Sequence, residues 1–553
     1  MSVRYAVSVV LNIHLPYVKE FSAAVQRNSL SDQPLSAMET APGKQAEDIN
    51  LTPETAEESW FFEALSETYI PLLMLFDRLE ADHVPFRLGL SLSPLCAHML
   101  CDELLQKKYA AYLDRQIDFG KQEIERLGGK PELCRLARRY FDQAIDRRTA
   151  FLTRYEGNVF KALEHYQRKR NIEFLAVPAT HAFLPFLCSY PEAVQAQIET
   201  ALSFYRYSLG INPHGFWLPE LGWSKDIDPF LRSYGFNYTI TDSHGFIFGN
   251  PPPSRGTFLP VRTPHGIVVL PRDFCACSDI AGMQKEGVYR NNSRDIGYEL
   301  PIEALGSFLA RNGARYQTGY KYWQASGEDT PYDPDAAQTA AREHARTFLE
   351  NCCDRLESAL RHMKEFPLSL CAFNADCFGQ HWHEGPQFLE SLFRLAAGYR
   401  ELRFMTPSEY LGQQSMSVYE VSLPDFSSWG DNGYAEVWLD SSNDWIYRHL
   451  NRSIDRMVEL AGRFSRNSNL KERALNQAAR ELLFAMASDW PSLLHRQECT
   501  GYAARQVEDA LQNFTTIYEA LGSNYINTEW FTNLERRHDI FPAINYRVFK
   551  RKS

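Results

Sequence analysis

Short apolar runs recur along this chain, and most of them end directly in polar residues. The runs cover residues 5–11, 86–92, 174–177, 215–218, 238–241, 266–270 and 368–373. Stretches with helical spacing separate them, and strands that alternate with helices indicate parallel β/α units. In a closed β/α barrel the catalytic groups lie on loops that follow the carboxyl ends of the strands. The sequence therefore predicts an α/β fold whose site residues come directly after these runs.

The segments between and after these runs differ from this pattern. Residues 29–58 hold no aromatic residue and many acids, so we expect a flexible, solvated insertion. Two other segments carry long helical patterns, the first of them broken at Gly128-Gly129. We therefore divide the chain into a barrel domain (1–96 and 171–415), a helical insertion (97–170) and a carboxyl-terminal helical domain (416–553).

Composition and charge exclude several classes of partner. Lys and Arg number 58 against 69 Asp and Glu, a net charge of −11, which argues against nucleic acids and anionic membrane surfaces. The longest apolar run, residues 70–76, is too short to span a bilayer. The 11 cysteines lack metal-type pairs and the first residues do not resemble a signal peptide, so we expect reduced thiols and a cytoplasmic protein.

Glu220 is the first candidate for chemistry. It lies in GFWLPELGW, between an apolar run and Trp223, and apolar surroundings raise the pKa of a carboxylic acid and suit nucleophilic or acid/base work. The alternative is a structural glutamate bonded to backbone amides.

A second cluster lies in AFNADCFGQHWHEGPQFLE, which contains Asp376, His381, His383 and Glu384. The two histidines lack the i, i+4 spacing of a helical zinc site, so we predict neither a metal ion nor another cofactor.

Aromatic residues near the polar loops favour a sugar ligand. These are Trp217, Trp223, Trp382, Trp429 and Trp438. Flat rings beside hydrogen-bonding groups suit the faces of pyranose rings, although a single tryptophan is more often a core residue. Trp429 and Trp438 differ because they lie in SSWGDNGYAEVW, a loop that two glycines keep irregular.

Together these motifs resemble glycoside hydrolase family 57, and within it the α-glucan branching enzyme-like group. The resemblance rests on LNIHLPYV, VPATHAFLPFL, GFWLPELGW, AFNADCFGQHWHEGPQFLE, FMTPSEYL, SSWGDNGYAEVWL, NDWIYRHLNR and AARELLFAMASDWP. It implies an incomplete (β/α)7 barrel with a helical insertion and a carboxyl-terminal helical domain. It also implies a retaining mechanism on α-1,4-glucans without an organic cofactor.

Carried over by position, the resemblance makes Glu220 the nucleophile. The acid/base position, an Asp in the family, holds Asn374, and an amide cannot protonate a leaving oxygen. Asp376 falls where the family usually has Glu and is a possible substitute. The first His of the family's His-x-His motif is Asn12, whereas the second is His14.

The resemblance also predicts residues that line the substrate cleft. Those from the motifs and loops are His14, His181, Trp217, Trp223, Asp242, His244, Trp382, Trp429 and Trp438. On the loop over the branching site the family usually has a Tyr, and Arg255 takes that place here.

Three functions remain open from the sequence. The first is branching or transglycosylation of glycogen- or starch-type α-1,4-glucan, in which Asp376 or Glu384 has taken over proton transfer. The second is an α-glucan-binding or regulatory homologue without turnover. The third is a metal-dependent, deacetylase-like hydrolase that would use His14, Asp242 and His244.

Overall fold

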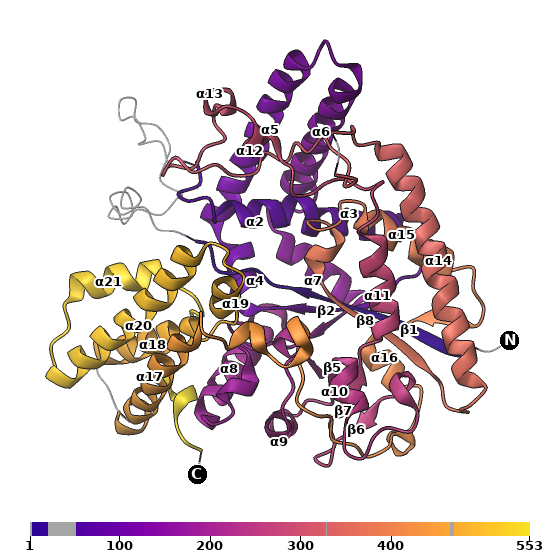
Figure 1. Cartoon of the computed structure of the whole chain (residues 1–553). Coiled ribbons are helices and arrows are strands. Elements are labelled where there is room, and N and C mark those ends of the chain that lie inside the picture. Colours follow the sequence, from indigo (N-terminus) through magenta and orange to yellow (C-terminus); the bar gives the residue numbers. More distant parts are fainter. Residues whose placement is uncertain (1–2, 20–50, 328, 465–468, 553) are drawn as a thin grey trace.

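Strands lie at the centre of the protein among helices (Figure 1), and their parallel pairing arranges them in a ring. The computed structural model describes residues 3–19, 51–327, 329–464 and 469–552. In these ranges the ring consists of β1 (Tyr5–Ile13), β2 (Leu88–Leu92), β3 (Ile172–Leu175), β4 (Gly215–Phe216), β5 (Tyr238–Thr241), β7 (Val268–Pro271) and β8 (Leu368–Asn374). Two short strands, β6 (Val261–Arg262) and β9 (Leu402–Phe404), pair with β7 and β1.

The ring is not one continuous sheet, because its strands belong to two sheets that meet at two weak joints. Within two sheets, neighbouring strands of the ring pair in parallel. A single bridge between Ala176 and Phe216 joins β3 to β4, and the backbone N–H of Asp273 donates to the carbonyl of Leu370 to join β7 to β8. The predicted incomplete (β/α)7 barrel is therefore confirmed.

Strand β1 determines how the site is aligned. All of its residues are buried, as expected for a parallel strand covered on both faces. Its register with β8 places Asn12 opposite Asn374. Because parallel strands end at the same edge, the polar residues after β1, β4, β5, β7 and β8 meet at one end of the barrel.

Helices cover the outside of the ring. Those that follow its strands are α3 (Ile70–Ala81), α8 (Pro191–Phe204), α9 (Asp228–Ser233), α10 (Ser243–Ile247), α11 (Phe274–Met283), α14 (Pro334–Leu360) and α15 (Gly385–Ala396). The expected helical insertion contains α4 (Pro94–Cys101), α5 (Glu103–Arg126), α6 (Pro131–Thr149) and α7 (Val159–Arg168). The break falls at Gly128-Gly129, as predicted, since α5 ends before the pair and α6 begins after it.

The carboxyl-terminal helices form a group beside α8 (Figure 1). They are α17 (Asp444–Arg463), α18 (Asn469–Ala485), α19 (Asp489–His495), α20 (Thr500–Ser523) and α21 (Thr528–Arg537). The Gln195 side chain on α8 donates to the carbonyl of Val548. The segment ahead of these helices packs on the barrel instead, because Val421 bridges to Arg262 and Ser427 to Trp223.

The predicted solvated insertion needs a correction at one end. Residues 29–50 lie outside the described residues. Residues 51–58 are packed, however, and Glu58 is only 1% exposed. Lys108 on α5 donates to both of its carboxylate oxygens, at 2.7 and 2.9 Å. This acid is buried because it has a buried cation as partner, which the local sequence does not reveal.

Within the described residues, no helix is long and apolar enough to cross a membrane. All eleven cysteines are free thiols.

We predict that Lys108→Met strongly destabilises the fold. The variant leaves the Glu58 carboxylate buried without a counter-ion, which costs about 3–5 kcal/mol. Urea unfolding measures this cost. Lys107→Met is the matched control, because Lys107 is 60% exposed and lies 4.0 Å from Glu103, an arrangement worth less than about 1 kcal/mol. Equal unfolding midpoints for the two variants would contradict the role given to the buried pair.

Candidate active site

Glu220 lies in a tight turn directly after β4. Its φ is 60° and that of Leu221 is 49°, and left-handed backbone at two successive non-glycine residues is strained. Trp429 holds the turn from the opposite segment: its backbone N–H donates to the Glu220 carbonyl at 2.8 Å. The Trp429 indole N–H donates to Glu220 Oε2 at 2.6 Å. The carboxylate is thereby fixed in one orientation.

The surroundings of Glu220 raise its pKa above the ordinary value. Burial is the largest cause, and the negative charge of Asp489 acts in the same direction. The Trp429 hydrogen bond and the nearby positive charge of Arg496 oppose the rise. A carboxylate with such a partly desolvated charge is a stronger nucleophile than a hydrated one.

His181 connects Glu220 to the first strand. Burial and the neighbouring His14 lower the pKa of His181 well below its usual value, so the ring is neutral. The amide of Asn12 donates to its Nε2 at 3.1 Å, which leaves the proton on Nδ1. His181 Nδ1 lies 3.0 Å from Ser488 Oγ and donates this proton to it. Ser488 Oγ donates in turn to Glu220 Oε1 at 3.4 Å. His181 therefore orients a hydroxyl toward the Glu220 carboxylate.

Asn12 and Asn374 contact each other. Ser91 Oγ donates to Asn12 Oδ1 at 2.5 Å, so the amide nitrogen of Asn12 faces His181 and Asn374. That nitrogen donates to Asn374 Oδ1 at 3.0 Å. The two positions at which the chain departs from the family motifs thus form one neutral, hydrogen-bonded pair.

The carboxyl-terminal helices complete the site. Asp489, at the start of α19, accepts from His14 Nε2 at 3.0 Å, and His14 Nδ1 lies 2.7 Å from Ser93 Oγ. The His14 ring stacks on His181 with centroids 3.9 Å apart. Ser488 and Asp489 were missed from the sequence, although both lie in the family-like motif AARELLFAMASDWP.

Arg272 is a further residue that the sequence analysis left unassigned. It follows β7, and its guanidinium lies 5.6 Å from the Trp429 ring. It donates to Asp242 at 3.1 Å. Burial raises the pKa of Asp242, but His244 and Arg272 outweigh it and hold the pKa below the usual range. His244 Nε2 donates to the Gly433 carbonyl at 2.8 Å, so these predicted cleft residues hold the Trp429 loop in place.

Four of the five predicted sugar platforms are buried instead. Trp217, Trp223, Trp382 and Trp438 are each 2% exposed or less. Trp438 stacks on Phe183 at 5.0 Å, and Trp217 packs edge-on against Trp429. Rings that cover the core offer no free face to a sugar, so Trp429 alone among the five remains half-buried at the site.

Arg255 is also not where the sequence predicted it. Its guanidinium pairs with Glu365 at 3.4 Å, and Glu365 precedes the first residue of β8. Arg255 therefore lies near the amino end of that strand, whereas Asn374 is at the carboxyl end. The position matched to the family's tyrosine does not cover the site.

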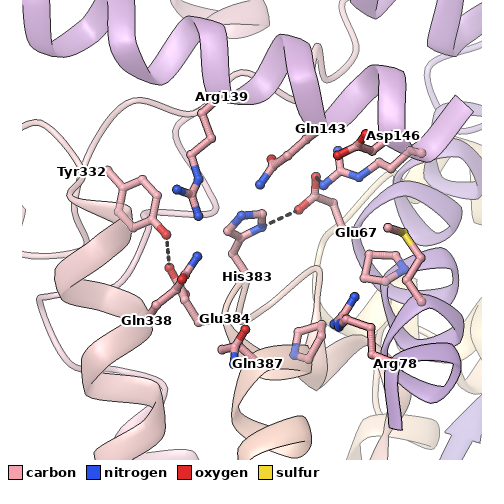
Figure 2. Close-up of a pocket in the computed structure, with 14 residues that line it drawn as sticks. Glu67, Arg78, Arg139, Gln143, Asp146, Tyr332, Gln338, His383, Glu384 and Gln387 are labelled. Carbon is pink, nitrogen blue, oxygen red and sulfur yellow. Dashed lines mark hydrogen bonds and ion pairs between the residues drawn. The ribbon is translucent and has the colours of Figure 1, made fainter. Parts of the chain in front are cut away.

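Neither proposed substitute for the acid/base joins this hydrogen-bonded network. Asp376 Oδ1 is buried and has no hydrogen-bond partner among the described residues, and it lies 3.8 Å from His381. Glu384 accepts from Tyr332 and lines a separate pocket with His383 (Figure 2).

The described residues do not gather His14, Asp242 and His244 into a metal-ligand set. Among these residues the group with metal-like spacing is Asp376, Cys377 and His381, whose ligand atoms lie within 4.8 Å of one another.

The barrel holds a fixed carboxylate after β4, and the carboxyl-terminal helices cover it. This arrangement defines a glycosidase-type site. Residues 45–424 match the model of glycosyl hydrolase family 57, and residues 449–549 match the carboxyl-terminal domain model of 1,4-alpha-glucan branching enzymes. The chain belongs to glycosyl hydrolase family 57.

Individual relatives agree with this assignment. The chain is 29% identical over 473 residues to a 1,4-alpha-glucan branching enzyme of Thermococcus kodakarensis, covering 81% of this chain and 68% of that protein. Its structure is similar to that of the alpha-amylase AmyC from Thermotoga maritima, with a TM-score of 0.86, 32% identity and full coverage of both chains. A family 57 branching enzyme from Pyrococcus horikoshii gives a TM-score of 0.83 at 25% identity, covering 99% of this chain and 97% of that one.

We predict that Glu220→Gln stabilises the protein at neutral pH. Because the pKa of Glu220 is higher in the folded protein than in the unfolded chain, ionising this group costs folding free energy. The cost is absent below the ordinary glutamate pKa and fully present above the raised one. The urea midpoint of the variant should therefore exceed that of the wild type at pH 7, and the difference should vanish as the pH falls.

The matched control is Glu103→Gln, because the Glu103 side chain is 81% exposed. Its midpoint should follow the wild type at every pH. A Glu220→Gln midpoint at or below that of the wild type at pH 7 would contradict a raised pKa.

Proposed function

We propose that this protein acts on α-1,4-glucan by a retaining mechanism, as a branching-type transglycosylase in which Glu220 is the nucleophile and turnover is low. The observation that carries the proposal is the fixed, partly desolvated Glu220 carboxylate in the Trp429 turn. Relatives named as branching enzymes and an alpha-amylase support the substrate class.

In this mechanism Glu220 attacks the anomeric carbon and forms a covalent glycosyl-enzyme, which an acceptor sugar or water then resolves. The Ser488 hydroxyl and the Trp429 indole hold the carboxylate in place during attack. The leaving oxygen needs a proton, and in the family motif the group that supplies it occupies position 374. Asn374 has no proton to give, and the absence of general acid catalysis costs about 10²–10⁴ in rate.

The same residue favours a second candidate function, an α-glucan-binding or regulatory protein without turnover. Asn12 pairs with Asn374 through a neutral hydrogen bond of 3.0 Å. The pair is polar and keeps the two strand ends joined, but neither of its residues can give up a proton to a leaving oxygen. Such a site binds sugar and leaves the glycosidic bond intact.

We predict that Asn374→Asp raises the rate of glucan cleavage and transfer by about 10²–10⁴. The new carboxyl group accepts the existing Asn12 hydrogen bond, so the change preserves the local geometry. Reducing-end release from amylose measures cleavage, and a loss of iodine staining without reducing-end release measures transfer to branches. The double variant Asn12→His/Asn374→Asp restores both family residues and should be faster still.

Asn374→Gln is the control, because it keeps an amide and should leave the rate unchanged. Glu220→Gln in the Asn374→Asp background should abolish the gained activity. Glucan binding by the wild type with no turnover in any of these variants would favour the regulatory function. Wild-type turnover that survives Glu220→Gln would overturn the mechanism.

A further inference from the structure

A polar pocket lies outside the active site, between α3, α6, α14 and the start of α15 (Figure 2). Its volume is about 190 Å³. Arg139 and Gln143 enter it from α6, Gln338 from α14, and His383 lies at its centre. None of its lining residues belongs to the hydrogen-bonded network around Glu220.

Glu67 organises one wall of this pocket. Its buried carboxylate pairs with Arg290 at 2.8 Å and with Arg147 at 3.3 Å. Burial raises the pKa of Glu67, but these two guanidinium groups outweigh it and lower the pKa well below the usual range. The group is therefore a permanent acceptor.

This acceptor determines the protonation of His383. Its Nδ1 lies 3.0 Å from Glu67 Oε2, and because a carboxylate only accepts, Nδ1 carries the proton. Burial and the charge of Arg290 lower the pKa of His383, so the ring is neutral. Nε2 is left as a bare acceptor at the centre of the pocket.

Two further acceptors at the pocket lack donors. Glu384 is 3% exposed, and one of its oxygens accepts from the Tyr332 hydroxyl at 2.5 Å. The other oxygen has no hydrogen-bond partner in the described part of the chain, and neither has Gln143 Oε1. A buried acceptor without a donor destabilises the fold, and a ligand rich in hydroxyl groups would supply the missing donors.

The charges around the pocket select against ions. A cation would meet Arg139 and Arg147, and an anion would meet the acceptors of His383 and Glu384. All three lining arginines are already paired, Arg78 with Glu390, Arg147 with Glu67 and Arg139 with Asp335 at 3.7 Å. What fits is an uncharged ligand that donates several hydrogen bonds, and the volume is below the roughly 300–1,000 Å³ of pockets for drug-sized ligands.

We propose that this pocket is a second saccharide site that binds one glucosyl unit, either free glucose or the end of a maltooligosaccharide. The choice of glucose among neutral sugars rests on the proposed function; the choice of a polyhydroxylated ligand rests on the pocket alone.

Isothermal titration of the full-length protein with glucose and with maltotriose tests the proposal. The wild type should show two classes of site. Gln143→Trp fills the pocket from the half-buried face of α6 and should remove one class. Glu384→Gln should weaken the same class by about tenfold, the effect of one lost hydrogen bond to a charged group. Gln122→Trp, on the exposed face of α5, is the control and should keep both classes.

Trp429→Ala should remove the other class, which belongs to the active site. If the proposed function fails, that class is absent and the class sensitive to Gln143→Trp remains. Unchanged isotherms in both Gln143→Trp and Glu384→Gln would overturn the second site. Binding of inorganic phosphate or Ca²⁺ that Gln143→Trp blocks, without any binding of glucose, would overturn it as well.

Discussion

The parallel pairing of β1 with β8 is the constraint on which the rest of the site depends. This register sets Asn12 beside Asn374, and the amide of Asn12 then reaches both Asn374 and His181. A slip of β1 by one residue would turn Asn12 to the other face of the sheet, away from Asn374. The polar network around Glu220 is therefore a property of the barrel's hydrogen bonding as much as of the individual side chains.

The two asparagines are best understood as one hydrogen-bonded unit. A histidine and an aspartate in contact would carry a shared proton, whereas two amides share only a neutral hydrogen bond. The neutral pair satisfies its own hydrogen bond and needs no counter-ion in this largely buried place. Their contact joins the carboxyl ends of β1 and β8 beside His181.

Local patterns predicted the strands, the helical break at Gly128-Gly129 and the place of Glu220 after a strand, because apolar runs followed by polar residues determine the barrel and the end at which its polar residues gather. They failed where a role depends on distant partners. The sequence predicted a hydrated Glu58, but Lys108 pairs with it in a buried place. It also predicted that Trp438 binds sugar, but the Trp438 ring stacks on Phe183. Arg255 could not be placed because its partner, Glu365, is 110 residues away in the sequence. Ser488 and Asp489 were missed for the same reason.

Asp489 contacts His14 across 475 residues of sequence, which has a consequence for how the protein matures. Domains generally fold in the order in which they leave the ribosome, so the barrel strands exist well before α19 is made. Until then Ser488 and Asp489 are missing, and the Glu220 carboxylate lacks part of the cover that shields it from water. A newly made barrel would thus hold an ordinary, hydrated acid. The buried, oriented form of the Glu220 carboxylate arises only in the last stage of synthesis, when α19 packs against the barrel.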